Sequence, residues 1–145
     1  MPPVADAPNS ELATFADELV EAIREPLELD RWSIRLVSGP LEDARASCEA
    51  SPEYREATIS LDFDKLKTGD DLAEVVTHEL GHCHTWPLHT LAEGLAHALA
   101  DSAAPAQREG LRKLLLEQVR DAGEQVTTDV GQTYLRLLRR AGVIE

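Results

Sequence analysis

The fold of this chain is organised around one stretch, Glu74-Val75-Val76-Thr77-His78-Glu79-Leu80-Gly81-His82. Its last five residues have the form H-E-x-x-H. On a helix, the i, i+4 spacing puts His78 and His82 on one face, one turn apart, where two imidazoles can reach one zinc ion. Glu79 then lies beside them as a candidate general base.

The length of the chain, 145 residues, predicts a single domain with a real core. We expect that domain over residues 10–145. Residues 1–9 hold three prolines and few side chains that a core would bury, which predicts a disordered leader.

Charge and cysteine content narrow the classes of partner and compartment. The net charge of −13 argues against nucleic acid or an anionic membrane as a partner, because an acidic surface repels phosphate. No apolar run approaches the ~18 residues of a membrane span. The two cysteines, Cys48 and Cys83, form no C-x-x-C pair, and no secretory signal precedes them. A reduced, cytoplasmic protein is therefore the expectation.

Apolar periodicity divides the chain into helices and strands. A helical repeat runs from a candidate N-cap at Ser10 to Pro26, and alternating apolar residues predict strands near 32–37, 44–49 and 57–63. Short links between these strands favour an antiparallel meander. The H-E-x-x-H helix is expected to begin near Asp70, with a capping-box spacing from Asp71 to Glu74, and to end at Trp86-Pro87.

Three further helical repeats follow, over about 90–101, 107–121 and 124–141, with Gly123 marking an end or a bend. The predicted fold is therefore an α+β domain. In it, a small three-stranded, mainly antiparallel sheet packs on the H-E-x-x-H helix and on three to four further helices.

Zinc catalysis by two histidines needs a third protein ligand. The candidates downstream of the motif are His84, His89, Glu93, His97, Glu117 and Glu124. In the 90–101 repeat the leucines cluster on one side, and Glu93 lies on the opposite, solvated side with His97. His84 is two residues beyond His82 and so lies across the helix, which indicates a supporting or surface histidine.

Glu124 is the only charged side chain in the apolar half of the last predicted helix. A carboxylate there is costly to bury unless it is paired or bound to a cation, which favours Glu124 as the third ligand. The nearby Gly131 would let another helix approach closely. An exposed first-turn glutamate is the alternative for Glu124, and Glu93 and His89 stay open as ligands.

The strand at 57–62 followed by the helix over 71–82 resembles the core of gluzincin-type zinc metallopeptidases. It is most similar to small H-E-x-x-H proteins of bacteriophages and prophages. The likeness covers roughly residues 32–84, with a looser match at Glu124-Gln125-Val126. These peptidases often carry an acidic residue four positions after the ligand glutamate, whereas this chain has Thr128.

The resemblance implies a zinc cofactor held by His78, His82 and a glutamate of a later helix, which fits Glu124. It also implies that Glu79 polarises the attacking water, and that a peptide or protein substrate binds in extended form along an edge strand, here the strand ending near residues 61–63. His84, His89 or His97 are candidates to stabilise the oxyanion. The alternatives are a non-catalytic zinc-binding protein and a helical domain in which the motif is incidental.

Overall fold

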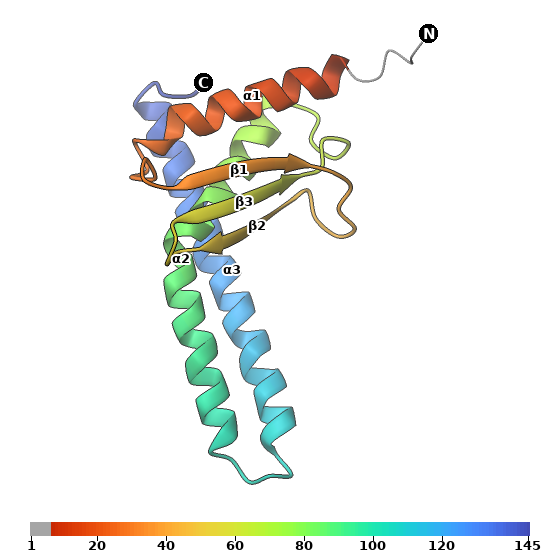
Figure 1. Ribbon diagram of the computed structural model, residues 1–145, viewed down its shortest axis with the longest axis vertical. Coiled ribbons are helices and arrows are strands. Elements are labelled where there is room, and N and C mark those ends of the chain that lie inside the picture. Colours follow the sequence, from red (N-terminus) through yellow and green to blue (C-terminus); the bar gives the residue numbers. More distant parts are fainter. Residues whose placement is uncertain (1–6) are drawn as a thin grey trace.

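A computed structural model describes residues 7–145 of the chain. Its elements are α1 (Ala7–Arg24), β1 (Ser33–Ser38), β2 (Ala46–Ser51), β3 (Glu56–Leu61), α2 (Gly69–Asp101) and α3 (Arg108–Arg140). The α+β class is confirmed. Figure 1 shows α1 and the sheet gathered around one end of a long α2–α3 hairpin, whose other end projects beyond them.

The sheet is mixed, with strand order β1-β3-β2. β2 and β3 pair antiparallel, but β1 and β3 pair in parallel, with Ser33 opposite Glu56. The prediction of an antiparallel meander is therefore wrong for β1. The next strand in the chain, β2, does not pair with β1 but lies on the far side of β3. Alternation identifies a strand but does not choose its neighbour.

One carboxylate holds the connection from β1 to β2. Asp62, only 4% exposed, accepts hydrogen bonds from the backbone N–H groups of Leu41 (3.0 Å) and Asp64 (3.2 Å). The bond from Leu41 is the largest cause of a lowered pKa for Asp62. This contact anchors the loop that leads into β2, the strand nearest the H-E-x-x-H residues.

The core lies where the sheet meets α1 and α2. The apolar side predicted for the H-E-x-x-H helix is confirmed, since all of its members are at most 6% exposed: Leu72, Val75, Val76, Leu80 and Cys83. They pack with Ile23 of α1 and Ile59 and Leu61 of the sheet, which are fully buried. This packing fixes the rotation of α2 and so the direction of its other faces.

Helix α2 starts with a side-chain cap. The Thr68 hydroxyl accepts a hydrogen bond from the backbone N–H of Asp71 at 3.1 Å, and Asp70 and Asp71 lie in the first turn. The cap is thus Thr68, three residues ahead of the capping box expected from Asp71.

The first helix, α1, begins at Ala7 rather than at Ser10. Of the predicted leader, residues 7–9 are helical and residues 1–6 lie outside the described part.

The two long helices run through both predicted breaks. α2 continues past Pro87 to Asp101, and α3 continues past Gly123 to Arg140; each is 33 residues long. Pro87 leaves the Cys83 carbonyl without its helical N–H partner, a local cost of ~3 kcal/mol. Packing of α2 against α3 along the hairpin offsets that cost, so two helices replace the four predicted here (Figure 1).

Glycines on α3 allow the two helices to lie close together. A Cβ added to Gly131 would be 3.0 Å from the Cα of His78, and one added to Gly123 would be 2.7 Å from Nδ1 of His89. The close approach expected at Gly131 is confirmed, and it is made to α2 beside the motif itself. Within residues 7–145, no helix is long and apolar enough to cross a lipid bilayer.

Candidate metal centre

Helix α2 brings the three motif side chains together. The potential ligand atoms of His78, Glu79 and His82 all lie within 4.8 Å of one another. The two imidazole rings are 5.1 Å apart between centroids and meet edge to face. This is the geometry that the i, i+4 spacing predicts.

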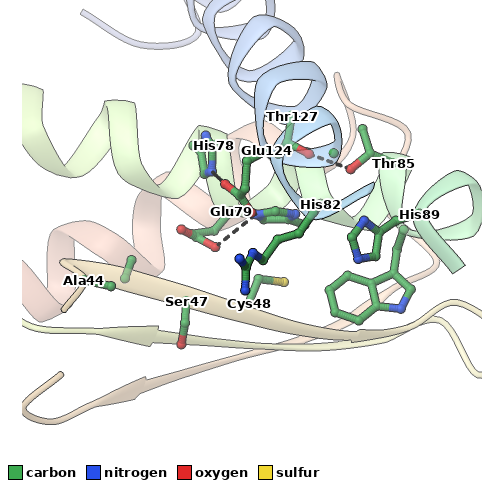
Figure 2. Close-up of a pocket in the computed structure, with 14 residues that line it drawn as sticks. Ala44, Ser47, Cys48, His78, Glu79, His82, Thr85, His89, Glu124 and Thr127 are labelled. Atoms are coloured by element: carbon green, nitrogen blue, oxygen red, sulfur yellow. Dashed lines mark hydrogen bonds and ion pairs between the residues drawn. The ribbon is translucent and has the colours of Figure 1, made fainter. Parts of the chain in front are cut away.

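A fourth side chain reaches the histidines from α3. Glu124 Oε2 lies 3.5 Å from Nε2 of His78, and its Oε1 lies 3.5 Å from Nε2 of His82 (Figure 2). The sequence singled out Glu124 as costly to bury, but its side chain is 57% exposed. The carboxylate therefore faces the two histidines from the rim of the cavity and keeps contact with water.

The donor set and its spacing fit a zinc ion. Two imidazole nitrogens and one carboxylate are a known ligand set of catalytic zinc, with bonds of about 2.0–2.2 Å. Two donors bound at those lengths and at a tetrahedral angle lie roughly 3.3–3.5 Å apart. Glu124 meets each histidine through a different oxygen, Oε2 for His78 and Oε1 for His82, both at 3.5 Å. With a turn of this carboxylate, the three residues could hold one ion and leave a fourth position open.

Glu79 occupies a different position from Glu124. Its carboxylate oxygen Oε2 is 3.8 Å from Nε2 of His82, and the residue is only 6% exposed. Burial, with a smaller contribution from the charge of Glu124, raises the pKa of Glu79 to about 7. A carboxyl group with this pKa can take up and release a proton near neutral pH, which is the requirement for a general base and acid.

His82 is also adapted to its surroundings. Burial lowers the pKa of its imidazole, and the charge of Glu124 offsets only part of that shift. A lowered pKa keeps the ring neutral at physiological pH. Only a neutral imidazole has a free lone pair to donate to a metal ion.

These side chains open into a cavity of about 410 Å³ between the two helices and the sheet. Strand β2 forms the opposite wall with Ala46, Ser47 and Cys48, as Figure 2 shows for the last two. Trp86 and His89 of α2 and Arg120 of α3 also belong to the lining. The cavity thus combines a floor of candidate metal ligands with one edge strand of the sheet.

Sequence reasoning missed Arg120, Trp86 and the β2 residues. A signal existed for two of them. Trp86 follows His82 by four residues and Arg120 precedes Glu124 by four, so each shares a helical face with a candidate ligand. The β2 residues carried no such signal, because only the strand order brings them to the cavity.

The prediction that the strand ending near residues 61–63 is an edge strand is wrong. That strand is β3, which lies between β1 and β2. Within residues 7–145, β2 pairs with β3 only, so the edge of the sheet next to the cavity belongs to β2.

Of the other candidate ligands, only His89 lines the cavity. Its Nε2 is paired at 3.0 Å with Oε1 of Glu93. His84 is exposed on another side of α2, with its Nδ1 2.8 Å from the Tyr134 hydroxyl, as expected of a supporting or surface histidine. His97 and Glu117 are exposed and do not line the cavity.

Two further contacts stiffen the surroundings of the site. The hydroxyls of Thr85 and Thr127 form a buried hydrogen bond of 2.8 Å between α2 and α3 (Figure 2). On the sheet side, Cys48 and Cys83 are free thiols. A hydrogen bond to Cys83, together with burial, raises the pKa of Cys48, which therefore lines the cavity as a protonated, largely apolar group.

Comparison with known proteins yields no relative. No family model matches the chain, and neither the curated proteins nor the solved structures give a significant match.

Proposed function

We propose that this protein is a zinc-dependent metallopeptidase, similar to the gluzincins. The observation that carries the proposal is the convergence of Glu124 on His78 and His82 at 3.5 Å, beside a buried Glu79 whose pKa is about 7. Two imidazole nitrogens and a carboxylate would hold the ion. A separate carboxyl group then remains free for proton transfer.

The chemistry divides between the ion and the chain. When bound, zinc supplies a Lewis acid that makes a water molecule lose its proton near neutral pH. Glu79 accepts that proton as the water oxygen bonds to the carbonyl carbon of the peptide. It then passes the proton to the amide nitrogen as the C–N bond breaks, so that an amine and a carboxylic acid leave the site.

Strand β2 gives a reason to expect a peptide rather than a small molecule. Its outer edge has no partner strand within residues 7–145, and Ser47 and Cys48 lie across the cavity from the histidines. An extended chain can add to such an edge through backbone hydrogen bonds. That pairing would hold a scissile bond alongside Glu79. Because it uses backbone hydrogen bonds, the peptide would not need a charge opposite to that of this acidic protein.

Two cavity residues are suited to stabilise the oxyanion that forms on the carbonyl. His89 is held by Glu93 at 3.0 Å, and Arg120 brings a permanent positive charge.

The cytoplasmic location, expected from the cysteine content, stays a prediction.

The test is the Glu79→Gln substitution, which removes the proton acceptor and keeps the shape. Zinc content should stay at the level of the unsubstituted protein, and cleavage of a library of internally quenched peptides should fall by about 10²–10⁴-fold. Glu117→Gln, an exposed carboxylate outside the cavity, is the matched control and should keep full activity.

Each alternative function predicts another result. Zinc bound at one ion per chain with no cleavage of any peptide would favour the non-catalytic metal-binding protein. A chain that binds no zinc, and whose stability a chelator leaves unchanged, would make the H-E-x-x-H motif incidental.

A further inference from the structure

The end of the α2–α3 hairpin that projects beyond the sheet exposes a leucine stripe, defined as Leu88, Leu91, Leu95 and Leu99 of α2. These side chains are between 58% and 67% exposed. Their spacing of three, four and four residues puts them on one helical face. The sequence predicted that face to point inward. Instead, the buried residues of this segment are Ala96 and Ala100.

The stripe is part of a wider apolar surface. Beside it lies a groove of about 410 Å³ between the two helices, lined by Leu88, Ala92, Leu115, Val119, Ala122 and Val126 among others. The nearest neighbours of the stripe on α2 are also small, Ala92 and Ala98. Glu93 and Asp101 lie on the other side of the helix. Single exposed leucines are ordinary, whereas a continuous apolar face on two helices indicates an interaction surface.

Charge identifies the partner that this surface suits. Residues 86–122 hold five carboxylates and four basic side chains, so they account for one of the thirteen net negative charges of the chain. The remainder of the molecule carries the other twelve. Those twelve fall in residues 1–85, since residues 123–145 hold three carboxylates and three arginines. Two copies meeting through α1 and the sheet would bring acidic surfaces together, whereas two hairpin ends meet almost without repulsion.

We propose that the leucine stripe and the adjoining groove form a homodimer interface, in which the hairpin ends of two copies pack as a four-helix bundle. A two-fold axis puts the stripe against the stripe of the partner, which is the self-complementary arrangement of an isologous dimer. The face is about 20 Å long and about two helix diameters wide. That is at the small end of specific interfaces, so the dimer should form at micromolar concentration.

This inference is independent of the metal. The dimer interface borders the site, because the groove shares Thr85, His89 and Gly123 with the metal cavity. None of the four leucines, however, lines that cavity. The dimer would therefore persist if the zinc proposal failed, and the reverse also holds.

Sedimentation equilibrium of the full chain from 1 to 200 µM gives a direct test. We expect the mass to rise with concentration from 15.9 kDa to twice that value. Leu91→Glu with Leu95→Glu should stay monomeric over the same range. Thr90→Glu with His97→Glu adds the same charge to exposed positions on the opposite face of α2 and should dimerise as the unsubstituted chain does.

Circular dichroism verifies that each variant keeps its helices. If the double glutamate variant unfolds, Leu95→Ser takes its place and should weaken dimerisation by at least ~10-fold. A monomer at 200 µM would overturn the proposal, whatever other protein binds the face. So would a dimer whose strength is unchanged in a folded Leu91→Glu, Leu95→Glu variant.

Discussion

The two halves of helix α2 differ in what covers their apolar side. From Gly69 to Thr85, that side is buried under the sheet and α1, and the remaining faces are free to hold His78, Glu79 and His82. Beyond Trp86, small alanines face α3 and the leucines are left in water. The same helical repeat is thus a core in one half and an open surface in the other.

The difference shows that rigidity is concentrated where the chemistry is expected. Core packing fixes α2 from one side, and Gly131 lets α3 fix it from the other, so that Glu124 arrives 3.5 Å from both imidazoles. The projecting half has fewer buried contacts and should unfold locally at lower cost. Three predictions sharpen this contrast, and they follow in order of expected effect.

The largest effect should come from removing one leucine in each half. Leu80→Ala empties a fully buried position and should lower the free energy of unfolding by about 2–5 kcal/mol. Leu95→Ala, at a position 58% exposed, should cost under ~0.5 kcal/mol when the chain is monomeric. Urea unfolding at low micromolar concentration measures both. Equal costs would contradict the contrast between the two halves.

Next comes the pH dependence of Glu79 in metal-free protein. Its pKa is about 7 when folded and 4.5 ordinarily, so the folded state binds more protons between these values. The contribution of this group to the free energy of unfolding is therefore complete below pH 4.5. It is lost as pH rises through 7, and the total loss is about 3 kcal/mol. Glu79→Gln removes the titration.

Unfolding in chelator at several pH values checks this prediction. The stability advantage of Glu79→Gln over the unsubstituted protein should grow by about 3 kcal/mol from pH 4.5 to pH 8. An advantage that does not change with pH would mean that Glu79 is not held in a buried, proton-retaining environment.

The smallest effect should come from two glycine substitutions on the hairpin. Gly131→Ala puts a Cβ 3.0 Å from the Cα of His78, so α3 must shift, at a cost of ~1–3 kcal/mol and with weaker zinc binding. Gly94→Ala meets nothing within 4 Å and should instead stabilise α2 by ~0.5–1 kcal/mol. Melting temperatures that fall equally for both variants would refute the close-packed role of Gly131.

Parts of this structure follow from local sequence and parts do not. The H-E-x-x-H spacing and the apolar repeat through Leu72, Val76 and Leu80 are local signals, and both predicted α2 correctly around the motif. Glu124 was singled out as a candidate ligand because its charge interrupts an apolar face. Its exposure differed from the prediction, because only the position of α3 decides how much water reaches the carboxylate.

The errors arose where distant segments decide the outcome. Pro87 and Gly123 are local stop signals, but packing between α2 and α3 overrides both. The parallel pairing of β1 with β3 depends on where β2 inserts, which alternation does not encode. The leucines at 91, 95 and 99 carry a core pattern that no described segment covers, which is why that face is the site of the dimer proposal.

The central claim, that two histidines and Glu124 together bind one zinc ion, is tested most directly by calorimetric titration of zinc into metal-free protein. We predict one ion per chain, an affinity lowered by more than ~10–100-fold in Glu124→Gln, and no change in Glu117→Gln. Absence of stoichiometric binding, or equal affinity in the unsubstituted protein and both variants, would contradict it.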